Sequence, residues 1–220
     1  MAVTVDTNTT YESGSGGFNS THTISAFDCS GTNSHLLVNA YSRELAAELD
    51  GITADGNAMA SQVTSENTNV CGVETWGYQI NNASFDIVGT TSNFKLLAMS
   101  AIGLGGVDQS TPIAGTNGSN TGFGTAANIS YTGTSGNMIF AFVNSQGAGA
   151  MTPVSGMTEL HDFDHGDSNL GQCWAGYVTA DGTSQTVGAT LGGNDNWAVC
   201  VIEVAAASAG SVFVTKVMMF

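Results

Sequence analysis

The stretch GNMIFAFVN at Gly136–Asn144 decides the fold class. Its six central residues are all apolar, so both faces of a strand formed here would be apolar. Such a run predicts a central strand covered on both sides, or an inner strand rich in aromatic residues. At Ser84–Val88, Phe85 and Ile87 alternate with polar residues, which predicts a strand with one buried face.

Similar short runs extend in both directions and are separated by clusters of Gly, Asn, Asp and Ser. This spacing predicts a sandwich or a barrel. Pro112 and Pro153, the only prolines, lie between runs, where a sheet tolerates them. The predicted fold is therefore all-β, a two-sheet antiparallel jelly-roll sandwich with at most one short helix.

Ser42–Gly51 is the segment that reads as a helix, with Ser42 as its cap and Gly51 as its end, or else as an irregular loop. Gly105–Thr125 and Ser145–Ser155 are rich in small and polar residues and are predicted to be surface loops. No internal sequence repeat divides the chain. A length of 220 residues suits one domain, so we predict an N-terminal arm at 1–16, a sandwich at 17–207 and an extension at 208–220.

The composition is short of cations, with 3 basic residues against 18 acidic ones and a formal net charge of −15. Such a chain repels phosphate, so neither nucleic acid nor an anionic membrane is expected as a partner. The first residues lack the pattern of a signal peptide, and no apolar run reaches the roughly 18 residues that span a bilayer. We therefore expect synthesis in a cytoplasm, which the protein leaves only by lysis or assembly, and no membrane partner.

Four cysteines, at 29, 71, 173 and 200, form no C-x-x-C pair. His161 and His165 have the H-x₃-H spacing of a zinc finger, but without paired cysteines before them such a site is not expected. Cys173 and Cys200 lie in apolar runs and are predicted to be buried free thiols, because Cys packs as a small hydrophobic residue. Sequence leaves open whether any two cysteines pair.

The segment HDFDHGD at 161–167 contains the candidate metal ligands. Asp162, Asp164 and Asp167 carry oxygen ligands of the kind that Ca²⁺ prefers. The alternative is a polar strand end that enters a turn, with His161 and Phe163 facing one side. Calcium is the one cofactor considered, and none is expected otherwise.

No catalytic constellation stands out, so we expect the protein not to be an enzyme. Nothing selects two of Glu74, Asp86, Glu159 and Glu203 as the acid pair of a glycoside hydrolase. There is no G-x-S-x-G elbow followed by a helix. The aromatic residues could form a sugar-stacking platform or could pack in the core: Trp76, Tyr78, Trp174, Tyr177 and Trp197.

The last ten residues are unusually apolar for a chain end. After a small-residue hinge at Ala205–Gly210 they could add a strand to a neighbouring subunit, or pack on their own domain. The predicted interface residues are Val212, Phe213, Val214, Val217, Met218, Met219 and Phe220.

Two motifs carry a family resemblance, GVDQSTP at Gly106–Pro112 and DNW at Asp195–Trp197. With the order of the strands around them, they resemble a jelly-roll domain recurrent in phage virion proteins, over about residues 17 to 207. The resemblance implies a sandwich like those of lectin-type domains and no catalytic residues. The helix-like segment and the apolar tail depart from the family pattern and put its mode of assembly in doubt.

The resulting functional expectation is a virion structural protein, either a capsid decoration (cement) protein or a tail-associated protein. Its partners would be other virion proteins and further copies of itself, and its location the virus particle. The alternative is a carbohydrate-binding, lectin-like module of a host-recognition assembly that holds a surface glycan. A glycan-cleaving enzyme is a third and weaker hypothesis.

Overall fold

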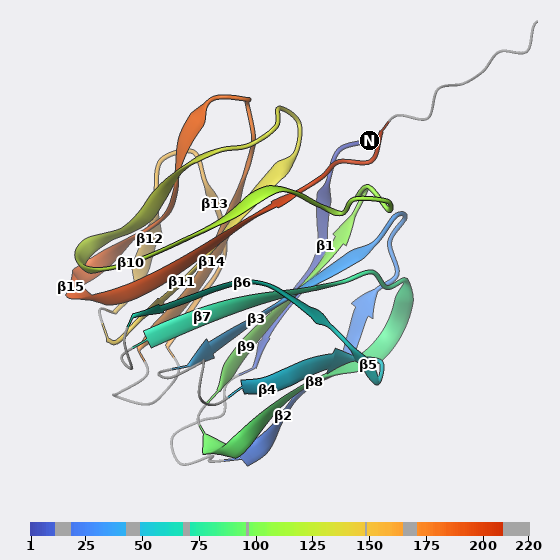
Figure 1. Ribbon diagram of the computed structural model, residues 1–220, viewed down its shortest axis with the longest axis horizontal. Coiled ribbons are helices and arrows are strands. Elements are labelled where there is room, and N and C mark those ends of the chain that lie inside the picture. Colours follow the sequence, from blue (N-terminus) through green and yellow to red (C-terminus); the bar gives the residue numbers. More distant parts are fainter. Residues whose placement is uncertain are drawn as a thin grey trace, which may run out of the picture.

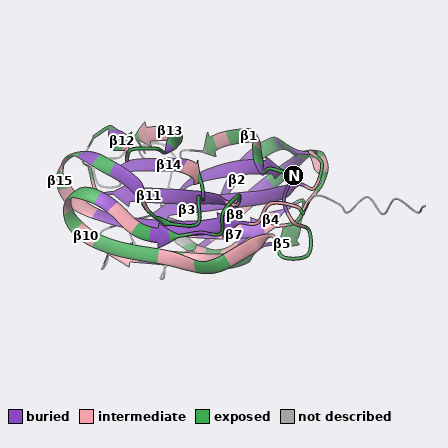
Figure 2. Cartoon of the chain, turned by 90° about the horizontal axis from the view of Figure 1, so that it is seen from above, coloured by how far each residue is buried: buried purple, intermediate pink, exposed green. Residues whose placement is uncertain are grey.

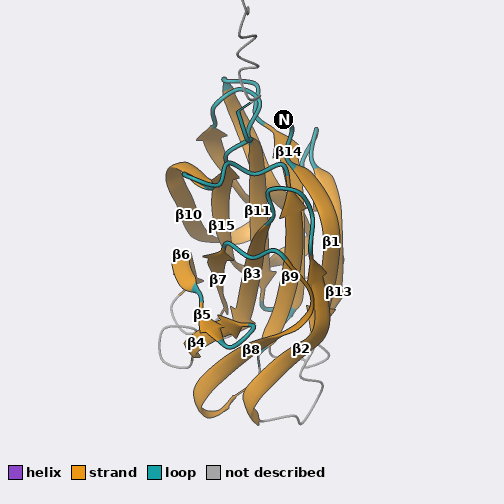
Figure 3. Ribbon diagram, turned by 90° about the vertical axis from the view of Figure 1, so that its right-hand side faces the viewer, coloured by secondary structure: helices purple, strands orange, loops and turns teal. Residues whose placement is uncertain are grey.

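The computed structural model describes residues 1–11, 19–42, 49–67, 71–95, 97–147, 149–164 and 171–208. These residues form antiparallel strands and contain no helix, which confirms the predicted all-β sandwich (Figure 3). The strands are β1 (Thr4–Tyr11), β2 (Asn19–Cys29), β3 (His35–Ser42), β4 (Leu49–Ala54), β5 (Asn57–Ala58), β6 (Ala60–Asn67), β7 (Cys71–Tyr78), β8 (Asn82–Lys95), β9 (Ala98–Gly105), β10 (Ile113–Thr132), β11 (Met138–Ser145), β12 (Met151–Pro153), β13 (Thr158–Asp164), β14 (Gln172–Thr179) and β15 (Ser184–Val204).

The first half of the chain forms two of the sheets. The larger has the order β1-β9-β3-β7-β6 and the smaller has the order β2-β8-β4-β5. The first and last strands of this half are therefore neighbours, the last pairs with β3, and β2 pairs with β8. This interleaving of two Greek keys is the strand order of a jelly roll.

The second half repeats this order. β10, β15, β11, β14 and β13 lie side by side in the same sequence as β1, β9, β3, β7 and β6. β10 and β15 are each long enough to contribute to both layers of the second half. Their pairing register shifts between Gly124 and Ala126, where each strand passes from one layer to the other. Residues 126–132 of β10, 184–191 of β15 and all of β12 form the smaller layer. The chain is therefore a double jelly roll.

Equivalent positions in the two halves follow from the register. His35 pairs with Leu104 as Met138 pairs with Val204. Gly77 pairs with Leu37 and Ala60, as Tyr177 pairs with Phe140 and Thr158. β6 and β13 also share an irregularity at the same place, at Gln62 and Leu160 respectively. The prediction that no repeat divides the chain was thus wrong for the fold, because a topology can recur when residue identities do not.

The two larger sheets pack face to face and form the centre of the molecule (Figure 1). Leu37, Ile102 and Leu104 of the first sheet meet Phe140 and Ile202 of the second in one buried cluster. The opposite face of each large sheet is covered by the smaller layer of its own half. β3, β9 and β11 are therefore buried along their whole length, which confirms the central strand predicted at Gly136–Asn144 (Figure 2).

Three predicted segments need correction. Thr4–Tyr11, expected in an arm, form β1 and pair with β9. The predicted helix has strand residues at both ends, Ser42 in β3 and Leu49–Gly51 in β4, and 43–48 lie outside the described residues. The Gly-rich stretch expected as a loop up to Thr125 is largely strand, because Ile113–Thr132 pair with β15.

Part of the predicted hinge is also held in place. The backbone N–H of Ala205 donates to the Pro112 oxygen at 2.9 Å, and that of Ala207 donates to the Gly106 oxygen at 2.8 Å. The amino group of Met1 donates to the Ala207 oxygen at 2.5 Å. The start of the chain, the segment between the halves and residues 205–207 thus meet at one end of the molecule (Figure 1).

All four cysteines are free and buried, as predicted for Cys173 and Cys200. Burial raises the pKa of Cys29 to about 11 and that of Cys71 to about 12, which disfavours the reactive thiolate. We expect no reaction with an aromatic disulfide reagent at neutral pH in the native protein and reaction of all four thiols in denaturant. Rapid reaction of one thiol without denaturant would contradict this packing.

Candidate functional site

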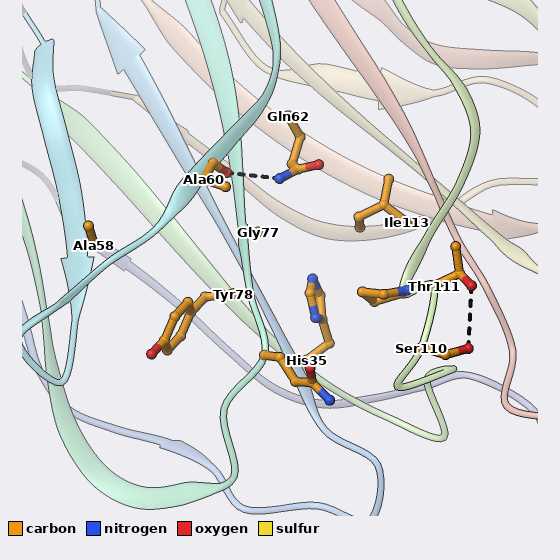
Figure 4. Close-up of a pocket in the computed structure, with 11 residues that line it drawn as sticks. His35, Ala58, Ala60, Gln62, Gly77, Tyr78, Ser110, Thr111 and Ile113 are labelled. Atoms are coloured by element: carbon orange, nitrogen blue, oxygen red, sulfur yellow. Dashed lines mark hydrogen bonds between the residues drawn. The ribbon is translucent and has the colours of Figure 1, made fainter.

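A pocket of about 520 Å³ opens between the β6–β7 edge and the segment that joins the two jelly rolls (Figure 4). Its walls come from both halves of the chain. The lining residues are His35, Ala58, Ala60, Gln62, Gly77, Tyr78, Gln79, Ser110, Thr111, Pro112 and Ile113. No acidic or permanently cationic side chain is among these residues, so the pocket is uncharged, with polar groups set among apolar ones.

The segment that joins the two jelly rolls is held by a turn, which the side chain of Asp108 closes. Its Oδ1 accepts hydrogen bonds from the backbone N–H of Ser110 at 2.8 Å and of Thr111 at 3.0 Å. The Ser110 hydroxyl donates to the same oxygen at 2.6 Å and, with these backbone bonds, lowers the pKa of Asp108. Gln79 in turn donates to the side-chain oxygen of Gln109. These bonds fix the wall of the pocket that Ser110 and Thr111 provide.

His35 is the first residue of β3 and lies in the pocket wall (Figure 4). Its side chain is 3% exposed, and neither ring nitrogen has a hydrogen-bond partner. Burial lowers its pKa to about 4, so the imidazole is neutral at physiological pH. A neutral imidazole has one donor and one acceptor. Neither the donor nor the acceptor of His35 is satisfied by the residues that the structure describes.

Gly77 forms the floor between His35 and Gln62. A Cβ atom at this position would lie 3.1 Å from His35 Nε2 and 3.3 Å from the Cγ of Gln62. The equivalent residue of the second jelly roll is Tyr177, whose ring lies 5.8 Å from that of Phe140. The glycine therefore lets His35 and Gln62 pack over this position, where the second jelly roll has an aromatic side chain.

The predicted His-Asp cluster proves to be a contact between the two sheets. His161 Nε2 lies 3.3 Å from the hydroxyl of Tyr41, and the rings of Tyr41 and Phe163 meet edge to face. Burial lowers the pKa of His161 to about 4. His161 and Phe163 thus share the interior face, as the alternation predicted, and the cluster joins the two jelly rolls.

The candidate metal ligands do not converge among the described residues, where no group of three or more His, Cys, Asp or Glu side chains suits a metal ion. Both carboxylate oxygens of Asp162 accept hydrogen bonds, from the backbone N–H of Met151 at 2.8 Å and from Gln172. Asp164 ends β13, and Asp167 lies outside the described residues. A calcium site here stays a prediction without support from the geometry.

The acidic residues considered as a catalytic pair all accept hydrogen bonds within the chain. Glu203 is buried and accepts from the backbone N–H of Thr134 at 2.8 Å and from Nδ2 of Asn137 at 2.6 Å. The donors to the other three are the Ser61 hydroxyl for Glu74, the Ala26 backbone for Asp86 and the Trp174 indole for Glu159. These bonds give each carboxylate a structural role.

The tryptophans pack in the core and do not form a sugar platform. Trp174 is fully buried and Trp197 is 6% exposed, while Trp76 packs against the core of the first jelly roll. Tyr78 is the member of the predicted platform that lines the pocket. Asp55 and Gly56 form the turn between β4 and β5, and both have positive φ, as in a type I′ hairpin.

Sequence reasoning missed His35, Gln62 and Gly77. Nothing marks them in the sequence, because His35 opens an apolar run and the other two lie in ordinary strands. The seven tail residues predicted as an interface, Val212 to Phe220, lie outside the described residues.

Comparison with known proteins finds no match: no family model, no curated protein and no solved structure is significantly similar to this chain. The part of the chain that the structure describes also has no helix long and apolar enough to cross a membrane. Fold and site thus define a double jelly roll with an uncharged pocket between its halves, and the resemblance to phage virion domains stays a prediction.

Proposed function

We propose that this protein is a structural subunit of a virus particle that acts through contacts with neighbouring subunits, as a capsid decoration or tail-associated protein. The observation that carries the proposal is the jelly-roll strand order, which occurs twice in one short chain. Jelly rolls are the architecture of many viral capsid and lectin domains.

The surface and the ends of the chain support assembly. With 10% charged residues, the protein covers itself mainly with small polar groups, which bind little by charge alone. Residues 205–207 are anchored beside Met1, so the apolar tail starts from a fixed point at one end of the molecule. A tail that starts there is well placed to add a strand to a neighbouring copy.

Light scattering after size-exclusion chromatography tests the proposal on the full chain and on a chain that ends at Ala207. We expect a discrete oligomer for the full chain and a monomer for the shortened one. A full-length variant with Val214→Asp and Val217→Asp, which keeps the tail but makes it polar, should also be monomeric. A full chain that stays monomeric at all concentrations would count against assembly through the tail.

A glycan-binding role is the second candidate. The buried tryptophans argue against the platform that the sequence predicted, whereas the uncharged pocket beside Tyr78 favours the role at a different place. A glycan site in this pocket would use other residues than the tail proposed for contacts between subunits.

A further inference from the structure

We infer that the pocket between the two jelly rolls is a binding site for a neutral saccharide of one or two sugar rings, with His35 as its buried polar contact. This site goes beyond the structural role proposed above and does not depend on the tail. It uses different residues from the aromatic platform that the sequence predicted.

The first argument is the unmet hydrogen-bonding capacity of His35. A buried polar group without a partner costs about 1–3 kcal/mol. The equivalent position in the second jelly roll is Met138, which is also buried, so this place in the fold accepts an apolar side chain of similar length. Packing therefore does not require a histidine at position 35. A bound hydroxyl would satisfy the hydrogen-bonding capacity of His35.

The second argument is the floor at Gly77, where the absence of a side chain lets His35 and Gln62 close on the strand. The first jelly roll has a glycine where the second has Tyr177, and the pocket lies over this glycine. His35, Gln62 and Gly77 come from three neighbouring strands, β3, β6 and β7, and meet at the floor (Figure 4). The floor of the pocket is thus built on paired strands, which hold their side chains firmly.

The third argument concerns the class of ligand. The lining holds the carboxamides of Gln62 and Gln79 and the hydroxyls of Ser110 and Thr111, whose oxygens can accept hydrogen bonds. Neutral polar groups of this kind suit the hydroxyls of a sugar. A volume of about 520 Å³ holds one or two rings. An anion would be repelled by the net charge of −15, and a cation would find no carboxylate in the lining.

Amide chemical shifts of the full chain test the site, in titrations with glucose, galactose, mannose, N-acetylglucosamine, maltose and lactose. We expect saturable shifts from at least one of these sugars at the backbone amides of Gly77, Tyr78, Ser110 and Thr111. The imidazole nitrogens of His35 should shift in the same titration. Sialic acid is the charged probe and should produce no saturable shift.

Two variants use the residues of the second jelly roll at the equivalent positions. Gly77→Tyr fills the floor, and His35→Met removes the buried polar contact; each should weaken binding by about tenfold or more. His35→Gln keeps a donor and an acceptor and should retain part of the affinity. Gln185→Ala, in a separate hollow beside Val178, is the matched control and should bind as the native chain does.

Three outcomes would overturn the inference. One is the absence of saturable shifts with every neutral sugar in the panel. Another is binding that survives both Gly77→Tyr and His35→Met in folded protein. The third is a set of shifts centred on residues away from the pocket. Because binding is read from amide shifts, a monomeric tail-deleted chain can be tested in the same way, so failure of the assembly proposal is distinguished from failure of this one.

Discussion

Acidification from pH 7 to pH 4 should lower the free energy of unfolding by about 3 kcal/mol through His35 alone. Burial lowers its pKa from 6.5 to about 4, and each unit of pKa difference between the folded and unfolded states is worth about 1.4 kcal/mol. Below pH 6.5 the unfolded chain takes up a proton that the folded chain refuses, so stability falls as the pH falls. His161, whose pKa burial also lowers to about 4, should add a comparable loss in the same window.

Urea denaturation midpoints measured between pH 8 and pH 4 check this expectation. The matched control is the double variant His35→Met and His161→Val, which carries the residues of the equivalent positions, Met138 and Val63. It should lose most of the slope between pH 6.5 and pH 4. Hydrogen bonds lower the pKa values of Asp108 and Asp181, so these carboxylates take up protons only at a more acidic pH. They should therefore not contribute to the slope between pH 6.5 and pH 4. An unchanged slope in the double variant would place the acid sensitivity elsewhere.

The fold class was predictable because the central strands appear in the sequence as short apolar runs. His35–Ser42 and Met138–Ser145 are buried on both faces and read as short, mainly apolar runs. A strand with cover on both sides needs no alternation, so its pattern is visible in the sequence without knowledge of its neighbours. The same runs explain why the four thiols are buried, since each cysteine lies in or beside a covered strand.

Residues 113–125 of β10 were predicted as a loop because their strand character comes from the partner strand β15. The segment is rich in Gly and polar residues, which are poor strand formers on propensity alone. A Cβ atom at Gly122 would lie 2.5 Å from the ring of Trp197, so the glycine lets that ring pack across the strand. Small residues that signal a loop in the sequence therefore serve close packing in the structure.

The repeat and the pocket could not be predicted for a related reason. The two jelly rolls share register but not residues, as the pairs His35/Met138 and Gly77/Tyr177 show. Both differences lie in the wall of the pocket, which has the more polar side chain at position 35 and the smaller one at position 77. Only the superposition of the two halves reveals which residues are unusual for their place, and that comparison requires the strand pairing.

Replacement of Phe140 by alanine should give the second large effect, a loss of about 3–5 kcal/mol in the free energy of unfolding. Phe140 is fully buried where the two large sheets meet, and its ring stacks on Phe142 at 6.3 Å and lies beside Tyr177. Loss of the ring leaves a cavity in the shared core, and the paired strands around it cannot close fully. Because this core joins both jelly rolls, we expect them to unfold together, in one transition, in the native chain.

Urea denaturation followed by tryptophan fluorescence measures this effect, since Trp76 lies in the first jelly roll and Trp174 and Trp197 lie in the second. The matched control is Phe123→Ala, which removes the same ring at a position that is 71% exposed and should change stability by less than about 0.5 kcal/mol. A Phe140→Ala protein as stable as the control would show that the two sheets do not form a tightly packed common core. Two separate transitions in the native chain would show that the jelly rolls fold independently, and that the contact between them stabilises neither.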